Sequence, residues 1–185
     1  MTMKIIAFTG MPWSGKSEAV TLAKNLNIPV VRMGDMVWDE TKRQGLQISD
    51  EQVGQVANQM RETHGKDIWA KRTLEKLNTI PYNSVVIIDG IRSIEEVETF
   101  KHMLSNDFIL VAIDASEKIR HKRALIRKRL DDSTTIENIK QRDKRERAWG
   151  LDAVIASADI IISNEKEKDE FHSQVQELLR RVLQR

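Results

Sequence analysis

The residues with the most distinctive chemistry form a glycine-rich segment near the amino terminus. Residues 10–17 read Gly-Met-Pro-Trp-Ser-Gly-Lys-Ser and match the phosphate-binding loop pattern G-x-x-x-x-G-K-[ST] in full. Glycines let successive backbone N–H groups surround phosphate oxygens, while Lys16 reaches the β- and γ-phosphates and the Ser17 hydroxyl ligates Mg²⁺. The segment therefore predicts a nucleoside triphosphate site, with ATP and Mg²⁺ as its ligands. Its residues are Gly10, Met11, Pro12, Trp13, Ser14, Gly15, Lys16 and Ser17.

A second segment whose side chains could take part in binding or catalysis follows the most apolar run of the chain. The run over 84–88 ends at Asp89, where a carboxylate would lie near the Mg²⁺ ion and its water shell. A helix N-cap is the alternative role for Asp89. Gly90 permits a close backbone approach, and Arg92 then projects from the carboxyl end of the sheet, where ligands bind in such folds.

Apolar runs that alternate with helical patterns provide the scaffold for both segments. Runs rich in Val and Ile, separated by helices, indicate a parallel sheet covered on both faces. The predicted strands are 4–8, 28–33, 84–89, 108–113 and 159–163. We therefore expect one α/β domain over residues 1–185, with the three-layer, five-stranded parallel sheet of phosphate-loop NTPases.

Two helical regions are added to this alternation. Region 34–80 has no strand pattern, and a capping box at Ser49 opens a helix that reaches about Thr63. We interpret this region as a helical insertion rather than a second domain, because it has no sheet and no linker. Region 117–149 reads as a helical pair hinged near Asp131.

The composition restricts the functional classes. The 185 residues contain no Cys, which excludes a thiol nucleophile and suits the cytoplasm. No apolar run approaches the roughly 20 residues of a membrane-spanning helix, so no membrane partner is expected. A stretch over 117–147 holds 12 Lys or Arg and 6 Asp or Glu, which indicates either a local anionic partner or a solvated helical face. That stretch lacks interleaved stacking residues, so nucleic acid is not expected as a partner.

Several segments resemble those of nucleotide kinases. Met33-Gly34-Asp35-Met36 resembles the Thr-Gly-Asp-Met segment of adenylate kinases, and Asp89-Gly90-Ile91-Arg92 resembles their Asp-Gly-Phe-Pro-Arg segment. The spacing from Asp114 to Arg123 and Arg127 is similar to the strand-to-lid spacing of dephospho-coenzyme A kinases. Residues 158–164, Ala-Asp-Ile-Ile-Ile-Ser-Asn, resemble the Ala-Asp-x-Val-Ile-x-Asn segment of the same kinases. Over essentially its whole length the chain resembles an archaeal group of adenylate-kinase-related phosphate-loop proteins.

The resemblance implies roles for regions and for single residues. Region 34–80 would be an acceptor-binding insertion, region 117–149 a short helical lid, and Asp35 and Arg92 would face the acceptor. The residues implied to contact ATP are Arg123, Arg127, Arg142 and Asn164. Arg123 and Arg127 share a helical face that suits phosphate oxygens, with salt bridging to nearby carboxylates as the alternative. The implied catalytic set is Lys16, Asp35, Arg92 and Arg127.

The sequence also departs from both kinase patterns. Trp38 stands where adenylate kinases carry an arginine for the acceptor phosphate, so either Arg61 or Arg43 would have to hold that phosphate. Of the Asp-x-Asp pattern of dephospho-coenzyme A kinases only Asp35 is present. Two of these residues also have a structural alternative to a role in binding. Asp35 could be the N-cap of a helix over 36–44, and Arg61 could be a surface residue.

These features predict a kinase that moves the γ-phosphoryl group of ATP to a nucleotide-like acceptor, with an AMP-type nucleoside monophosphate favoured. A dephospho-coenzyme A kinase is one alternative, and for a hydroxyl acceptor of that kind Asp35 would accept the proton. A nucleotide-binding switch or slow ATPase is an alternative of a different class. The protein is expected to be a monomer or a homodimer.

Overall fold

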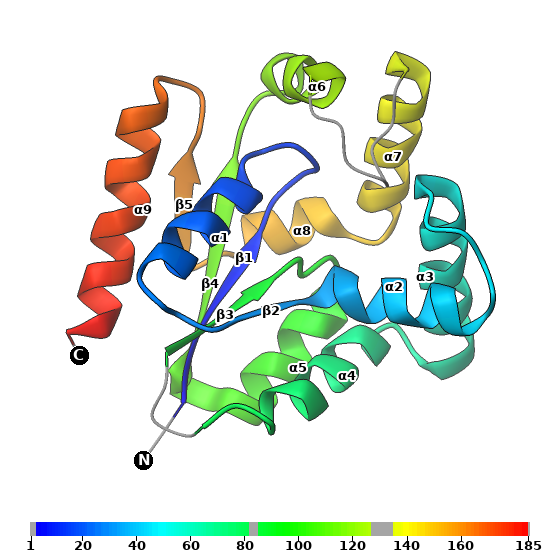
Figure 1. Ribbon diagram of the computed structural model, residues 1–185, viewed down its shortest axis with the longest axis horizontal. Helices are drawn as coiled ribbons and strands as arrows, with labels where there is room; N and C mark the ends of the chain where they lie inside the picture. Colours follow the sequence, from blue (N-terminus) through cyan, green and yellow to red (C-terminus); the bar gives the residue numbers. More distant parts are fainter. Residues whose placement is uncertain (1–2, 82–84, 127–134, 185) are drawn as a thin grey trace.

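The computed structural model describes residues 3–81, 85–126 and 135–184. Within them the predicted sheet is confirmed, with five parallel strands in the order β2-β3-β1-β4-β5 (Figure 1). The strands are β1 Lys4–Thr9, β2 Val30–Arg32, β3 Val85–Asp89, β4 Phe108–Asp114 and β5 Ile160–Ser163. Phe8 pairs with Asp89 at the carboxyl ends of β1 and β3, so the phosphate loop and the segment containing Arg92 leave the sheet side by side.

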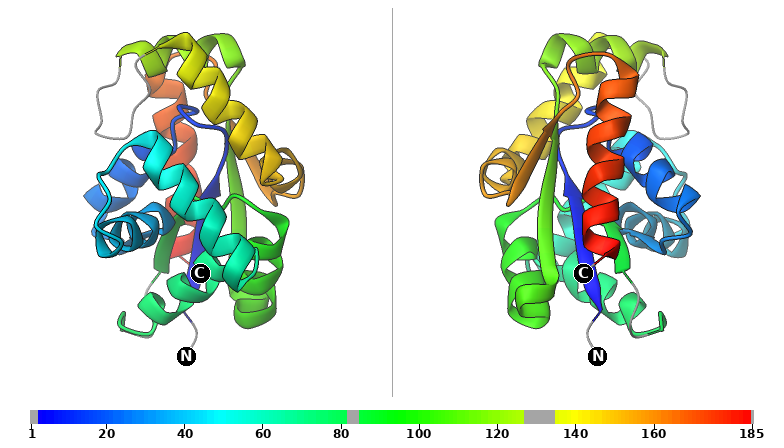
Figure 2. Two further views of the ribbon diagram at one scale, coloured as in Figure 1. Left: turned by 90° about the vertical axis from the view of Figure 1, so that its right-hand side faces the viewer. Right: turned by 90° about the vertical axis from the view of Figure 1, so that its left-hand side faces the viewer.

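Successive residues of the strands feed two hydrophobic cores. In β1, Ile5 belongs to one core and Ile6 to the other, and both are fully buried. Helices α1 and α9 cover the Ile6 side, whereas α5, α8 and the insertion helices α2, α3 and α4 cover the Ile5 side, which makes three layers (Figure 2). The helices are α1 Lys16–Asn25, α2 Met33–Arg43, α3 Asp50–His64, α4 Ile68–Leu77, α5 Ile94–Leu104, α6 Glu117–Ile126, α7 Ile136–Ala148, α8 Leu151–Ala156 and α9 Lys168–Leu183, with a short 3₁₀ helix at Ser105–Asp107.

Helix α2 begins at Met33, directly after β2 and earlier than the sequence predicted. Met33 and Val37 lie one turn apart and are both buried in the Ile5 core, so packing starts the helix without a capping side chain. The predicted second strand is shortened accordingly. Asp35 lies inside the first turn, and its interpretation as an N-cap is wrong.

The region predicted to form a lid, called the lid below, contains α6 and α7, which lie over the carboxyl end of the sheet, above the loop that joins β1 to α1 (Figures 1 and 2). Ser49 is the N-cap of α3 and accepts a hydrogen bond from the Gln52 N–H at 3.2 Å, which is one half of the predicted capping box. Arg127 and the hinge near Asp131 lie outside the described residues. None of the helices in the described part of the chain has the length and apolar character needed to cross a membrane.

Glu40 ties the first insertion helix to the third. Its carboxylate is 2% exposed and accepts hydrogen bonds from Arg43, from Gln44 and, at 2.9 Å, from Arg72 of α4. The hydrogen bond from Arg43 is the largest influence on this carboxyl, and despite burial its pKa falls to about 2. The ionised form therefore stabilises the insertion.

We expect Glu40→Gln to lower the free energy of unfolding by about 1–2 kcal/mol near neutral pH. Because the folded-state pKa is depressed, the stabilisation is complete above the ordinary glutamate value and is lost as the pH falls toward about 2. Urea unfolding of wild type and variant in neutral and acidic buffer measures the difference. Glu75→Gln, at an exposed position of α4, is the control. An equal loss of stability in acid for wild type and Glu40→Gln would contradict this assignment.

Candidate functional site

The phosphate loop joins β1 to α1 and turns at two glycines with positive φ, Gly10 at 137° and Gly15 at 119°. A Cβ atom at Gly10 would collide with the Ile113 carbonyl oxygen, and one at Gly15 with the Asn164 side chain. Both positions therefore exclude side chains for steric as well as conformational reasons. Trp13 also has a positive φ, 62°, which residues other than glycine rarely adopt.

Lys16 points into the concavity of this loop. Its Nζ atom donates hydrogen bonds to the carbonyl oxygens of Gly10 at 2.5 Å and Met11 at 2.9 Å. Burial lowers the pKa of this amine well below its usual value, and the positive charge of Arg92 lowers it further, whereas Asp89 and Glu146 act in the opposite direction. An anionic ligand would offset both unfavourable effects, so the loop is electrostatically prepared for phosphate.

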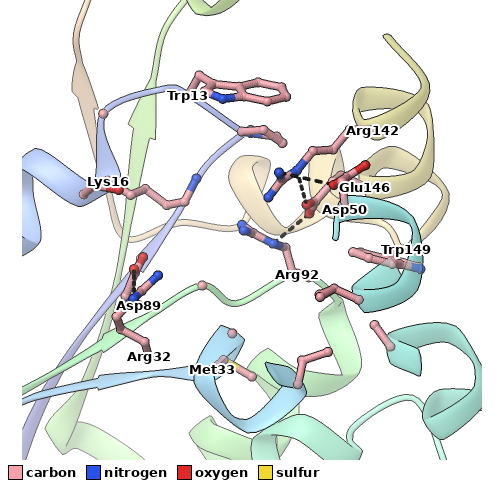
Figure 3. Close-up of a pocket in the computed structure, with 18 of the residues that line it drawn as sticks. Trp13, Lys16, Arg32, Met33, Asp50, Asp89, Arg92, Arg142, Glu146 and Trp149 are labelled. Carbon is pink, nitrogen blue, oxygen red and sulfur yellow. Dashed lines mark ion pairs between the residues drawn. The ribbon is translucent and has the colours of Figure 1, made fainter. Parts of the chain in front are cut away.

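One cavity of about 680 Å³ opens beside Lys16 and extends between the lid and the insertion (Figure 3). The predicted site residues that line it are Pro12, Trp13, Gly15, Lys16, Ser17, Arg61, Asp89, Arg92, Arg123, Arg142 and Asn164. Gly10, Met11 and Ser14 are buried parts of the loop. Arg127 lies outside the described residues.

Asp89 ends β3 on the cavity wall. Its Oδ2 atom lies 3.8 Å from Arg32 Nε, and its buried Oδ1 has no hydrogen-bond partner among the described residues. A buried carboxylate oxygen of this kind fits a Mg²⁺ ion or its water ligands, together with the Ser17 hydroxyl. Helix α5 takes its N-cap from Ser93 instead, through a full capping box with Glu96, so the N-cap alternative for Asp89 is wrong.

Charged side chains from three parts of the chain meet in the middle of the cavity (Figure 3). Arg92 Nε lies 2.7 Å from Glu146 Oε2 on α7, and Arg92 Nη1 donates to the Gly10 carbonyl at 3.4 Å. Arg142 and Arg145 of α7 both pair with Asp50 of α3, at 3.2 and 2.7 Å. These ion pairs hold lid and insertion together above Lys16.

The lid is also fastened to the phosphate loop. Arg120, whose side chain is 2% exposed, donates to the Pro12 carbonyl at 3.1 Å and pairs in a bidentate manner with Asp143 of α7. Arg123 donates to the Ser14 carbonyl and to Asn164, and the Asn164 amide in turn donates to Ser14 at 2.8 Å. Arg123 and Asn164 therefore support the loop as well as lining the cavity.

Trp13 lies between the lid helices and the cavity. The indole is 6% exposed and packs with Ala124 of α6 and Ile139 of α7. The Arg142 guanidinium lies 5.2 Å from the centre of the ring. Trp13 also lines the cavity, so one side chain contacts both the lid helices and the space available to a ligand.

The end of the cavity inside the insertion is aromatic and cationic. All four tryptophans of the chain line the cavity, three of them, Trp38, Trp69 and Trp149, outside the phosphate loop. Arg61 lines it too: its side chain is 9% exposed, pairs with Glu96 at 3.0 Å and stacks on Trp149 at 4.3 Å. Arg43 is 73% exposed and pairs with Glu40, away from the cavity. Of the two predicted candidates, only Arg61 is in place to meet a ligand.

Asp35 does not line the cavity. Its side chain is 47% exposed and pairs with Arg32 at 3.3 Å. Since α2 starts at Met33, this position of the first turn points outward while Gly34 and Val37 face the cavity. The expectation that Asp35 faces the acceptor together with Arg92 is therefore not met.

Sequence reasoning missed Asp50, Arg120, Glu146 and Trp149. Arg120 precedes Arg123 by three residues and Glu146 follows Arg142 by four, so helical spacing alone places each beside a predicted site residue. Asp50 belongs to the predicted capping box, and that interpretation gave no reason to expect its ion pairs with Arg142 and Arg145. No local signal distinguishes Trp149.

The sequence of the chain matches a family of known proteins. Residues 9–140 match the AAA domain family AAA_17. A UPF0200/UPF0201 protein of Archaeoglobus fulgidus is 42% identical over 97% of this chain, which spans only 56% of that relative. A UPF0200 protein of Methanosarcina barkeri is 40% identical over 98% of this chain and 97% of its own length.

Solved structures share the fold at low sequence identity. A gluconokinase from Sinorhizobium meliloti superimposes with a TM-score of 0.62 at 14% identity, over 97% of this chain and 93% of its own. A shikimate kinase from Acinetobacter baumannii in complex with shikimate gives 0.59 at 17% identity, over 99% and 94%. The chain thus has a phosphate-loop kinase fold.

Proposed function

The chain belongs to the UPF0200 family and to the AAA_17 family of AAA domains, and from that premise we propose that it is an ATP-dependent phosphotransferase. In this proposal it moves the γ-phosphoryl group of ATP to a small nucleotide-like acceptor, and an AMP-type nucleoside monophosphate is the favoured one. The phosphate loop binds the donor, and the end of the cavity inside the insertion binds the acceptor.

The observation that carries the proposal is the extent of the cavity beside Lys16. From the loop it continues past Arg92 to Arg61, Trp38 and Trp149, so it has room for a second ligand next to the transferring phosphoryl group. A switch or an ATPase needs space only for the nucleotide and a water molecule. An aromatic and cationic compartment is useful when an anion with a planar body must also bind.

Transfer in this site requires alignment and charge neutralisation more than covalent chemistry. Lys16 and Arg142 lie on the donor side, and Arg92 lies where donor and acceptor would meet. Mg²⁺, held by Ser17 and Asp89, would neutralise charge that develops on the phosphates. A phosphate acceptor is already anionic and needs no base. For a hydroxyl acceptor, Asp89 would replace Asp35 as the proton acceptor, because of these two carboxylates only Asp89 lines the cavity.

The nature of the walls favours a nucleotide over the acceptors named for the structural neighbours. Shikimate and gluconate are small hydroxylated acids, whereas this compartment is lined by the indoles of Trp38 and Trp149 together with Val37, Val53 and Ala57, and the buried Trp69 belongs to the adjoining core. Indole rings stack well on a nucleobase, at about 1–3 kcal/mol per base. Arg61 supplies the anion contact, since two of its buried nitrogens have no hydrogen-bond partner in the described part of the chain. Dephospho-coenzyme A, with an adenine ring and phosphates, is the second candidate acceptor.

An acceptor screen tests the proposal. Purified protein with ATP and Mg²⁺ is offered AMP, CMP, UMP, GMP, dephospho-coenzyme A, shikimate, gluconate or no acceptor, and the products are separated by anion-exchange chromatography. We expect a nucleoside monophosphate to raise ADP formation at least about tenfold over the acceptor-free rate and to be phosphorylated itself. ATP hydrolysis that no acceptor accelerates would instead favour the switch or slow ATPase.

A further inference from the structure

Glu146 is a buried carboxylate at the centre of the proposed reaction site. Its side chain is 4% exposed, with Oε2 2.7 Å from Arg92 Nε and Oε1 3.8 Å from Arg142 Nε. Arg92 comes from the segment after β3, and Arg142 lies one turn earlier on α7. Figure 3 shows the Glu146 carboxylate between these two guanidinium groups and opposite Lys16.

Glu146 is ionised although it is buried. Burial favours the neutral carboxyl, but Arg92, Arg142, Lys16 and Arg145 together outweigh that effect and lower its pKa below the ordinary value. Of the other carboxylates near these cations, Asp50 pairs with Arg142 and Arg145, and Asp89 pairs with Arg32, so among the described residues Glu146 is the carboxylate that pairs with the Arg92 side chain. Glu146 is thus the counter-charge of Arg92.

The contact between lid and insertion does not depend on Glu146. Asp50 of the insertion already joins it to the lid through ion pairs with Arg142 and Arg145. The Asn58 side chain adds a further link, because it accepts a hydrogen bond from Trp149 at 2.5 Å. Removing a carboxylate from water costs free energy, and a negative charge among phosphate-binding cations repels the ligand. A benefit of this carboxylate to turnover must therefore come from the way in which it orients its cations.

We propose that Glu146 is a positioning residue for phosphoryl transfer: it holds Arg92 and Arg142 at the orientation that the transferring group requires and offsets their charge in the substrate-free site. The proposal rests on the proposed function, in which these arginines meet the donor and the acceptor. The carboxylate repels the phosphates of the bound substrates and of the transition state alike, so its benefit to turnover comes from the orientation that it gives to Arg92 and Arg142.

The test compares Glu146→Gln, which removes the charge at nearly constant shape, with Glu137→Gln at an exposed position of the same helix. Calorimetry with a non-hydrolysable ATP analogue and Mg²⁺ measures ground-state affinity. Steady-state kinetics measures kcat with the stimulating acceptor or, if none stimulates, with ATP alone. We expect Glu146→Gln to bind the analogue about three- to tenfold more tightly and to lose about ten- to a hundredfold in kcat. The control should match wild type in both.

A second variant separates charge from placement. Glu146→Asp retains the charge on a shorter stem, so analogue affinity should stay within about twofold of wild type while kcat still falls. The proposal is overturned if Glu146→Gln binds the analogue no more tightly than Glu137→Gln, or if its kcat is unchanged. Absence of acceptor stimulation in the wild type would instead refute the phosphotransferase assignment, and the calorimetry would still decide the role of Glu146.

Discussion

Lys16→Ala is expected to lower ATP turnover at least about a hundredfold while the protein stays folded. The amine donates to two loop carbonyls inside the phosphate concavity, so it is preorganised for charge that develops on the transferring group. Its loss should affect stability little, because burial and the nearby Arg92 disfavour the charged amine in the free protein. Steady-state ADP formation measures the turnover, and thermal unfolding followed by circular dichroism confirms the fold.

A matched control is available on the same helix. Lys24 is exposed in the last turn of α1, and Lys24→Ala removes the same charge from the protein without touching the loop. It should retain wild-type turnover. A folded Lys16→Ala protein that also kept near-normal turnover would show that the loop does not bind the phosphates of a reacting nucleotide.

The sheet and the phosphate loop were predictable because their signals are local. Buried parallel strands need continuous apolar runs, and residues 84–88 and 108–113 contain little else. The loop pattern fixes backbone geometry through Gly10 and Gly15, whose positive φ values and crowded surroundings leave no room for a side chain. The sequence therefore predicted the position and the backbone geometry of the loop correctly.

The end of the cavity that we propose for the acceptor was less predictable, because tertiary packing decides which side chains line it. Asp35 has the residue type of a helix N-cap, but burial of Met33 and Val37 starts the helix earlier and turns Asp35 outward. Arg61 and Arg43 are indistinguishable by type. Only the position of α3 against α5 and α7 brings Arg61 into the cavity, beside Glu96 and Trp149.

In the lid, too, the roles of individual side chains could not be predicted from the sequence. The basic stretch was visible in the sequence, but its cations divide into loop supports such as Arg120, cavity residues such as Arg142, and exposed residues such as Lys144. The carboxylates Asp50, Asp143 and Glu146 make this division through contacts between distant segments. Net charge counts cannot reveal such pairings.

Arg92→Ala is the second substitution with a large expected effect, and it acts on the acceptor side. Its guanidinium lies between the Gly10 carbonyl and Glu146, and its backbone N–H donates to Glu96, which also holds Arg61. A lost charge-assisted hydrogen bond to the acceptor would reduce kcat/KM for the acceptor by about ten- to a hundredfold, or about 1.5–3 kcal/mol. The dissociation constant of the ATP analogue should change by less than about threefold. Asp35→Asn, outside the cavity, should leave both quantities unchanged.

Removing Arg92 alone also leaves Glu146 buried without its closest counter-charge, at a cost of roughly 1–3 kcal/mol in stability. The double variant Arg92→Ala/Glu146→Gln removes both charges, so it should recover stability without recovering acceptor kinetics. Thermal unfolding and two-substrate kinetics on the single and double variants separate the two effects. If the double variant regained wild-type kcat/KM for the acceptor, the defect of Arg92→Ala would be structural and Arg92 would not contact the acceptor. If both variants instead lost affinity for the ATP analogue in proportion to turnover, Arg92 would belong to the donor site, and the boundary between donor and acceptor would lie further toward Arg61.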